Sequence, residues 1–123
     1  MKDSDINIVL AGNPNSGKTT LFNSLTGLKQ KVGNYPGITV EKKTAKIVID
    51  GYTSKLIDLP GIYSLYSKSM DEKVAQNIIC NSYDSDYADV IVVIADASNL
   101  RRSIFLLTQI IDLKIPVVLA LNM

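Results

Sequence analysis

The stretch from Gly12 to Thr19 reads Gly-Asn-Pro-Asn-Ser-Gly-Lys-Thr and matches the pattern G-x-x-x-x-G-K-[ST] at every fixed position. Such a loop uses glycines so that successive backbone N–H groups turn inward onto a phosphate, and a lysine to place positive charge near its outer end. The apolar run Ile6 to Ala11 before it suits a buried strand, and Thr19 to Thr26 after it has helical spacing that ends at Gly27. Strand, loop and helix therefore follow in the order that is typical of a loop that binds nucleotide phosphates. A glycine-containing turn in an unrelated α/β domain is the weaker interpretation, because the pattern is rare by chance.

The composition limits the chemistry that the chain can carry out. Its 123 residues fit one domain, and its 13 basic and 12 acidic residues create no overall field that favours nucleic acid or an anionic membrane. The absence of histidine removes imidazole bases and typical zinc sites, and one cysteine excludes an intramolecular disulfide. The longest apolar runs, residues 90–95 and 115–121, are far shorter than the roughly 18 residues of a membrane span. We therefore expect a soluble domain in a reducing, cytoplasmic setting.

The middle of the chain reads as a loop, a hairpin and a capped helix. Glycine, asparagine and proline mark residues 28–38 as a loop. Thr39 to Asp50 and Tyr52 to Leu59 read as two antiparallel strands joined at Asp50-Gly51. Ser69 as N-cap and Glu72 three residues later form a capping-box pattern, which predicts a helix to about Ser82.

The remaining elements complete a three-layer α/β sandwich. Asp89 to Asp96 reads as a parallel strand at the sheet centre, and Ile115 to Leu121 as another buried strand. A helix from about Asn99 to Leu113 lies between them, and its spacing predicts an inner face made of Leu100, Ile104, Leu107 and Ile111. We expect a mostly parallel sheet with one antiparallel edge strand. The strand ends at Asp58, Asp96 and Asn122 then share one edge with the phosphate loop, although Asp96 reads better as a helix cap than as a ligand contact.

Two further motifs suit a divalent cation beside the phosphates. Asp58-Leu59-Pro60-Gly61 reads D-x-x-G at a strand end, where the carboxylate suits Mg²⁺ or its water and the Gly61 N–H suits a terminal phosphate. Alone this motif is common in ordinary turns, but the upstream loop favours the functional interpretation. The hydroxyl of Thr19 is the expected protein ligand of Mg²⁺ in the loop, and Thr39 is placed to complete the coordination.

Three strings together resemble one family. Gly12 to Asn23, Val32 to Lys43 and Asp58 to Leu65 closely resemble the cytoplasmic G domain of the bacterial and archaeal ferrous iron transport protein B family, and the match runs from about Ile6 to the end of the chain. The first string is shared with many GTPases, whereas the other two are much more specific. The resemblance implies a P-loop GTPase sandwich that lacks its final strand and helix, with Thr39 in switch I and Asp58 to Gly61 at the start of switch II.

The resemblance also implies which residues contact the nucleotide. The guanine-reading motif N-x-x-D would begin at Asn122, and the chain stops at Met123, two residues short of the aspartate. Guanine specificity is thus implied by the family alone. The expected nucleotide-binding residues are Gly12, Asn13, Pro14, Asn15, Ser16, Gly17, Lys18, Thr19, Thr20, Gly37, Ile38, Thr39, Asp58, Leu59, Pro60, Gly61 and Asn122.

Hydrolysis needs an unusual arrangement in this chain. Ras-like enzymes carry a glutamine directly after D-x-x-G, but this chain has Ile62 there, which has no hydrogen-bonding group. The only arginines are Arg101 and Arg102, at the start of a later helix, so a cis arginine finger is not expected. The family resemblance implies instead that Asn13 binds K⁺ in the charge-stabilising place, the alternative being a simple loop-forming asparagine. The expected catalytic set is Lys18, Thr39, Gly61 and Asn13.

The leading functional prediction is slow, Mg²⁺-dependent and K⁺-stimulated GTP hydrolysis that regulates ferrous iron transport. The resemblance implies that residues 1–123 are one partial G domain of a longer membrane protein. It places the domain at the cytoplasmic face of the prokaryotic membrane, with the parent's helical and transmembrane parts as partners and a homo-oligomer formed through the parent. No nucleic acid partner is expected. Two alternatives stay open: a non-catalytic nucleotide-binding interaction module, and a soluble regulatory GTPase of the ribosome or tRNA type.

Overall fold

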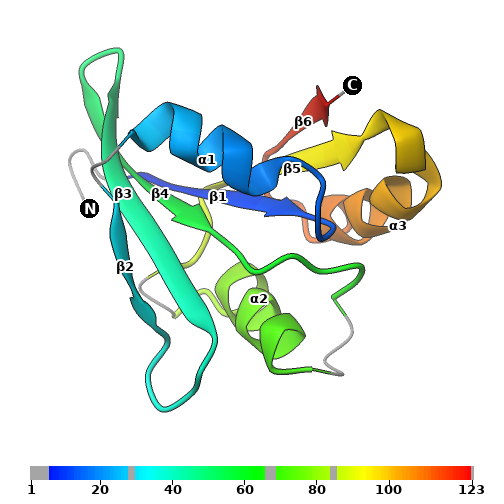
Figure 1. The fold of residues 1–123 in the computed structure, drawn as a ribbon, viewed down its shortest axis with the longest axis horizontal. Coiled ribbons are helices and arrows are strands. Elements are labelled where there is room, and N and C mark those ends of the chain that lie inside the picture. Colours follow the sequence, from blue (N-terminus) through cyan, green and yellow to red (C-terminus); the bar gives the residue numbers. More distant parts are fainter. Residues whose placement is uncertain (1–5, 28–29, 66–68, 84–85, 123) are drawn as a thin grey trace.

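A single mixed sheet organises the chain, which the computed structural model describes over residues 6–27, 30–65, 69–83 and 86–122. The six strands lie in the order β2-β3-β4-β1-β5-β6 (Figure 1). The strands are β1 (Ile6–Gly12), β2 (Lys31–Asn34), β3 (Glu41–Ile49), β4 (Tyr52–Asp58), β5 (Val90–Asp96) and β6 (Val117–Asn122). The helices are α1 (Lys18–Thr26), α2 (Met70–Cys80) and α3 (Leu100–Ile111), with a short 3₁₀ turn η1 (Ala97–Asn99) before α3.

Alternating side chains divide the core into two layers, one on each face of the sheet. On one face, Phe22 of α1 packs with Leu10 and Leu56. On the other face, α2 and α3 cover a larger cluster that includes Val9 and Ile57. Because neighbouring residues of a strand point to opposite faces, Val9 and Leu10 enter different layers. The three-layer α/β class predicted from the sequence is confirmed.

The register brings the predicted motifs to one edge of the sheet. β1 runs parallel to β4 and β5, with Leu10 opposite Asp58 and Gly12 opposite Ile94. β5 runs parallel to β6, with Asp96 opposite Asn122. The carboxyl ends of these parallel strands therefore meet, which is the edge where α/β sheets bind ligands.

Local signals in the middle of the chain are also confirmed. The β3–β4 hairpin turns at Asp50 and Gly51, whose φ angles of 50° and 81° are those of a type I′ turn. Ser69 caps α2 through the Glu72 N–H, and the Glu72 side chain accepts from the Ser69 N–H in return.

The loop expected over residues 28–38 contains a strand. β2 pairs antiparallel with β3, with Lys31 opposite Thr44 and Asn34 opposite Glu41. All four residues of β2 are exposed, so the strand buries no apolar face and leaves no alternating pattern in the sequence. β3 is the one strand that runs antiparallel to the others. Because β2 pairs with β3, β3 lies inside the sheet, so the prediction of an antiparallel edge strand is wrong.

The C-terminal elements differ from expectation in what they bury. β5 is the penultimate strand, not the central one, and β6 forms the edge, so Val118 and Leu121 are about half exposed. The inner face of α3 consists of Ser103, Leu106 and Ile110.

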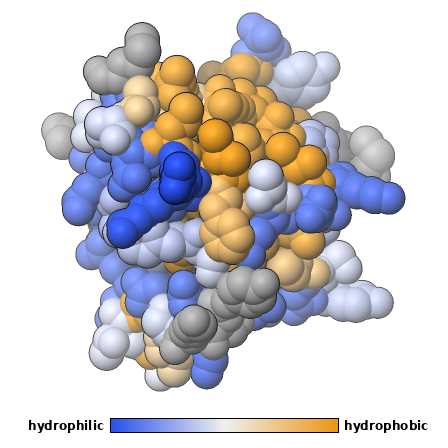
Figure 2. Space-filling model, turned by 90° about the vertical axis from the view of Figure 1, so that its right-hand side faces the viewer, coloured by the Kyte–Doolittle hydropathy of each residue, from blue (hydrophilic) through white to orange (hydrophobic). Residues whose placement is uncertain are grey.

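The predicted inner face of α3 is therefore wrong, because Leu100, Ile104 and Ile111 are exposed and Leu107 only partly buried. Apolar residues surround most of this helix, so spacing alone does not select the face. Figure 2 shows apolar side chains gathered on the side of the molecule that carries α3 and β6. None of the described helices is long and apolar enough to cross a membrane.

Candidate nucleotide-phosphate site

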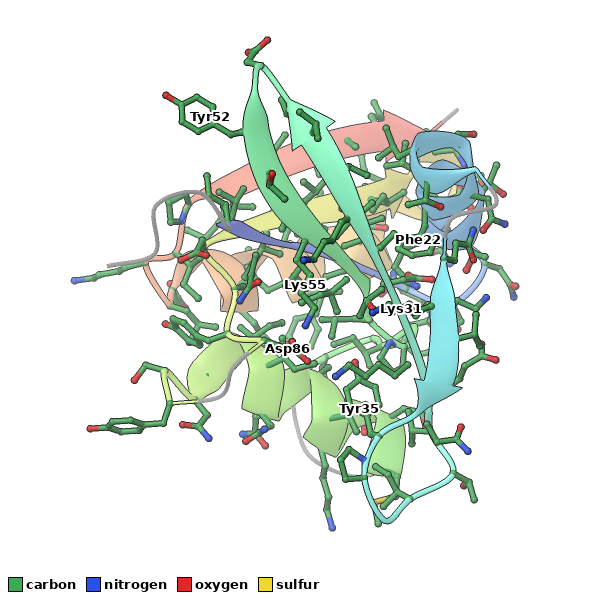
Figure 3. The ribbon with its side chains drawn as sticks, turned by 90° about the vertical axis from the view of Figure 1, so that its left-hand side faces the viewer. Phe22, Lys31, Tyr35, Tyr52, Lys55 and Asp86 are labelled. Atoms are coloured by element: carbon green, nitrogen blue, oxygen red, sulfur yellow. The ribbon has the colours of Figure 1, made fainter. Side chains whose placement is uncertain are left out.

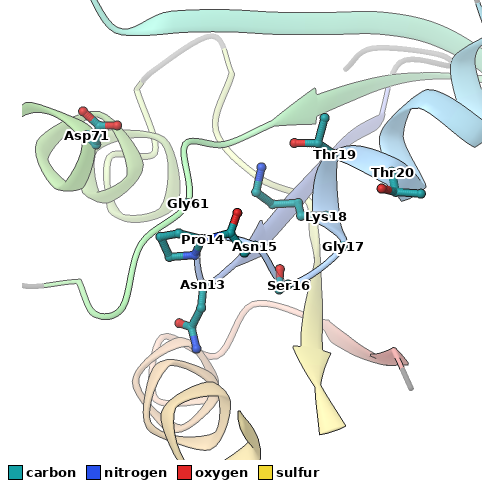
Figure 4. A pocket seen from close by; sticks show the side chains of 10 residues that line it. All are labelled: Asn13, Pro14, Asn15, Ser16, Gly17, Lys18, Thr19, Thr20, Gly61 and Asp71. Carbon is teal, nitrogen blue, oxygen red and sulfur yellow. The ribbon is translucent and has the colours of Figure 1, made fainter. Parts of the chain in front are cut away.

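The loop between β1 and α1 lines an open cavity of about 340 Å³. The chain turns through left-handed conformations at Asn15 (φ 63°) and Gly17 (φ 97°), and the Ser16 N–H donates to the Asn13 carbonyl at 3.2 Å. Figure 4 shows the lining residues, which are Asn13, Pro14, Asn15, Ser16, Gly17, Lys18, Thr19, Thr20, Gly61 and Asp71. Gly17 is the N-cap of α1 and has no side chain to cap the helix, so first-turn N–H groups remain for an anion.

Gly12 is required by close approach to backbone, and Gly17 by its left-handed conformation. A Cβ on Gly12 would lie 2.8 Å from the Ser16 hydroxyl and 2.9 Å from the Ile94 carbonyl oxygen. A Cβ on Gly17 would lie 2.4 Å from the Asn122 amide nitrogen, at a φ that side chains rarely adopt. The phosphate loop at Gly17 therefore packs closely against Asn122 at the end of β6.

Lys18 and Asp58 join the first and second motifs. The Lys18 ammonium forms an ion pair with the Asp58 carboxylate, and both side chains are buried. Together with Thr19 and Gly61 they line a second cavity of about 230 Å³ beside the loop. The structure therefore brings the ammonium, the hydroxyl, the carboxylate and the glycine to one place, as the motifs predict.

The residues at this second cavity fit a magnesium phosphate. Hydroxyl and carboxylate oxygens are ligands that Mg²⁺ prefers, and Thr19 and Asp58 supply one of each. The buried Ser16 hydroxyl in the adjoining loop has no hydrogen-bond partner among the described residues, so it offers a polar group to a bound anion.

The D-x-x-G segment is tied to the phosphate loop along its backbone. The Leu59 N–H donates to the Leu10 carbonyl at 3.1 Å, and the Ile62 N–H donates to the Gly12 carbonyl at 3.0 Å. A Cβ on Gly61 would lie 2.9 Å from the Pro14 Cα, so only glycine fits at this contact. Gly61 and the phosphate loop are thereby in direct backbone contact.

Asn122 reaches the loop from the end of β6. Its Nδ2 donates to the Ser16 carbonyl at 3.0 Å. It also lines a third cavity of about 320 Å³, whose walls combine the polar Thr20 and Ser24 with apolar residues of β5 and β6. Asn122 therefore contacts the phosphate loop, and its role in nucleotide binding stays a prediction.

Comparison with known proteins identifies the family of the chain. A sequence profile of the family described as "Ferrous iron transport protein B" matches residues 6–123. The chain belongs to this family. The Fe(2+) transporter FeoB of Salmonella typhimurium LT2 and that of Escherichia coli K12 are each 47% identical over 118 residues, which is 96% of this chain and 15% of each relative. The chain thus spans a small part of the curated FeoB proteins that it matches.

Solved FeoB structures share the fold. The G domain of T. maritima FeoB superposes with a TM-score of 0.86 at 46% identity, covering 95% of this chain and 71% of that one. The cytosolic domain of T. maritima FeoB in a GDP form superposes with a TM-score of 0.85 at 45% identity, covering 98% of this chain and 45% of that one. The chain therefore has the P-loop GTPase fold of a FeoB G domain.

The residues predicted to form switch I lie outside the cavities. The expected residues Gly37, Ile38 and Thr39 line none of the three cavities described above, and Thr39 is exposed. The Tyr35 N–H donates to the Val40 carbonyl and the Ile38 N–H to the Tyr35 carbonyl, which closes a turn that holds Thr39 outward.

Asn13 also departs from its expected role. In the orientation of the Asn13 amide that pairs its nitrogen with an acceptor and its oxygen with a donor, Nδ2 donates to the Ile62 carbonyl at 2.8 Å. Oδ1 then accepts from the Ser103 N–H at 3.2 Å. Figure 4 shows the side chain directed toward α3, away from Lys18. This orientation does not present the amide oxygen to a cation in the phosphate cavity, so the expected K⁺ ligand does not fit as the side chain stands.

Three charged residues that line these cavities are not among the site residues predicted from the sequence. Asp71 in the first turn of α2 lines both the first and the second cavity, and Glu41 and Lys43 of β3 line the second. The capping box placed Asp71 at a helix start, but nothing in the sequence showed that this turn faces Thr19.

Proposed function

We propose that the chain binds guanine nucleotide with Mg²⁺ and hydrolyses GTP slowly, as the regulatory G domain of a ferrous iron transporter. The observation that carries this proposal is the meeting of Lys18, Thr19, Asp58 and Gly61 at one cavity beside the phosphate loop. The GDP form of the 45% identical T. maritima cytosolic domain supports the choice of nucleotide.

Each residue has a separate task in this proposal. Lys18 leaves Asp58 and neutralises phosphate charge, while the backbone N–H groups of Gly17 to Thr19 hold the phosphate oxygens. Thr19 and Asp58 hold Mg²⁺, which supplies charge stabilisation for the transferred phosphoryl group. The Gly61 N–H donates to the terminal phosphate, and Thr39 turns inward to complete the cation site when that phosphate is present.

K⁺ stimulation remains a prediction of the family resemblance. The Asn13 amide would have to leave Ile62 and Ser103 to face a cation, so we assign K⁺ no step of the reaction.

The surroundings of the domain belong to the same proposal. We place it in the cytosol at the membrane, attached to the helical and transmembrane parts of a parent transporter, with any homo-oligomer formed through that parent. The family match favours this setting over a GTPase that acts on ribosomes or tRNA.

The non-catalytic alternative draws support from Ile62. Its side chain is apolar and 2% exposed at the position that follows D-x-x-G, so it cannot orient an attacking water. Single-turnover conversion of GTP to GDP by the intact protein, measured with Mg²⁺ in K⁺ and in Na⁺, separates the two functions. Turnover supports the GTPase, and a higher rate in K⁺ supports the cation role. Tight binding without turnover would establish the interaction module instead, and equal rates in K⁺ and Na⁺ would remove K⁺ alone.

A further inference from the structure

The segment after the D-x-x-G motif is attached to α3 by two side chains of that helix. The Arg102 guanidinium lies 5.0 Å from the centre of the Tyr63 ring. The Leu65 N–H donates to Gln109 Oε1 at 2.8 Å. Gln109 follows Arg102 by about two helical turns, so both side chains leave α3 on the same side. Residues 63–65 therefore lie along one side of α3.

The position of Arg102 has a local reason in this attachment. A cation in the first turn of a helix opposes the helix dipole, and the first turn of α3 contains no acidic residue to offset it. The Tyr63 ring gives Arg102 a favourable partner through a cation–π contact. The neighbouring Arg101 is exposed and forms no ion pair or ring contact among the described residues. Contact with Tyr63 therefore distinguishes Arg102 from Arg101.

The same segment is fixed to the phosphate loop at its other end. The Ile62 N–H donates to the Gly12 carbonyl at 3.0 Å, and the Ile62 side chain is buried. Gly61 lies against Pro14 and lines both the first and the second cavity (Figure 4). In the conformation in which α3 holds residues 63–65, Gly61 therefore lies at the wall where the proposed function places a terminal phosphate.

We propose that Arg102 and Gln109 are positioning residues that hold Gly61 ready for the terminal phosphate of a nucleoside triphosphate, and so favour the triphosphate over the diphosphate. The selectivity rests on the proposed function, because the contact between the Gly61 N–H and the terminal phosphate comes from there. A segment that is already held loses less conformational freedom on binding than a free one. Loss of the α3 contacts therefore weakens binding of the triphosphate, whereas a diphosphate, which has no group at Gly61, binds as before.

Hydrogen exchange in the nucleotide-free intact protein, followed by NMR at single amides, tests the attachment. Gln109→Leu removes the acceptor of the Leu65 N–H at similar side-chain size, whereas Gln109→Glu keeps an acceptor oxygen there. We expect the Leu65 N–H to exchange about three- to tenfold faster in Gln109→Leu, and within about 1.5-fold of the parent in Gln109→Glu. Equal exchange in the parent and in Gln109→Leu, or equal acceleration in both variants, overturns the attachment.

Calorimetric titration with Mg²⁺–GDP and with a non-hydrolysable Mg²⁺–GTP analogue tests the selectivity. We expect Gln109→Leu to weaken binding of the analogue about three- to tenfold, and Arg102→Ala to weaken it about two- to fivefold. The affinity of both variants for GDP should stay within about 1.5-fold of the parent. Gln109→Glu and Arg101→Ala are the matched controls, and both should leave the two affinities unchanged.

The two measurements separate this inference from the proposed function. A merely structural role would weaken both nucleotides alike, and that result overturns the selectivity, as does analogue binding that neither variant changes. In either case GDP binding by the parent leaves the proposed nucleotide site standing. If the parent binds neither nucleotide, the proposed function fails and the selectivity falls with it, while the attachment to α3 is decided by hydrogen exchange alone.

Discussion

At the scale of single residues, the Lys18–Asp58 pair is the feature on which the site depends. Burying two charges is costly, and their mutual attraction offsets this cost only while both are present. The pair therefore keeps an ammonium and a carboxylate out of water beside the loop. A phosphate can then replace Asp58 as the partner of Lys18, and Mg²⁺ can replace Lys18 as the partner of Asp58. This arrangement leads to opposite expectations for stability and for binding.

We expect Lys18→Met to destabilise the nucleotide-free protein by about 3–5 kcal/mol, because it leaves Asp58 buried without a counter-charge. The same change should weaken Mg²⁺–GDP binding by about a hundredfold, which urea unfolding and calorimetric titration measure separately. The double variant Lys18→Met/Asp58→Asn should regain most of the stability and none of the affinity. Recovery of affinity in the double variant would show that the pair does not serve the phosphate.

Gly61 provides a second test at this scale. Gly61→Ala inserts a methyl group against the Pro14 backbone and should cost about 1–3 kcal/mol in urea unfolding. Gly33→Ala is the matched control, since its Cβ would meet nothing within 4 Å, and its effect should stay within about 0.5 kcal/mol. Equal costs at the two positions would mean that Gly61 is not fitted to the loop.

At the scale of elements, Asp86 joins β3 and β4 to the segment before β5. Its buried carboxylate accepts from Lys55 of β4 at 2.5 Å and pairs with Lys42 of β3 at 2.9 Å. Figure 3 shows Lys55 and Asp86 next to each other, with Tyr35 nearby. Lys42 also lies 5.4 Å from the centre of the Tyr35 ring, which connects this cluster to the turn before Thr39.

The Asp86 cluster should make stability depend on acid pH. Burial acts to raise the pKa of Asp86, but the hydrogen bonds and charges of Lys55 and Lys42 outweigh it and hold the pKa below its ordinary value of 3.8. A lowered folded pKa means that Asp86 contributes stability above the unfolded value and loses it as pH falls through the folded value. Asp86→Asn should therefore cost about 1–2 kcal/mol at pH 7.

Urea unfolding at pH 7 and at successively lower pH checks this dependence. The difference in unfolding free energy between the parent and Asp86→Asn should begin to shrink below about pH 4. A difference that stays constant down to the acid unfolding limit would contradict the lysine pairing as its source.

Elements whose pattern is local were predictable from the sequence, and those that depend on neighbours were not. The Ser69–Glu72 capping box and the Asp50-Gly51 turn are encoded within a few residues and formed as predicted. β2 was missed because its pairing with β3 is long-range and its residues are exposed. The face of α3 was misjudged because its burial depends on which side meets the sheet and the Asn13 loop.

At the scale of the whole molecule, the site is an edge of the sheet onto which several segments converge. The loop after β1, the end of β4, the first turn of α2 and the end of β6 all reach it. The motifs predicted that Lys18, Thr19, Asp58, Gly61 and Asn122 lie at one edge, and the structure places them there, while their binding roles stay predictions. The Asn13 orientation and the outward turn of Thr39 depend on packing between distant segments, which one sequence does not reveal.

The central claim is that this edge binds a guanine nucleotide through the phosphate loop. Calorimetric titration of the intact protein with Mg²⁺–GDP and Mg²⁺–ADP, repeated with Lys18→Met, tests it most directly. We predict that GDP binds at least about tenfold more tightly than ADP, and that Lys18→Met weakens the binding of GDP about a hundredfold. Equal affinity for GDP and ADP, or GDP binding that Lys18→Met leaves unchanged, would contradict the account.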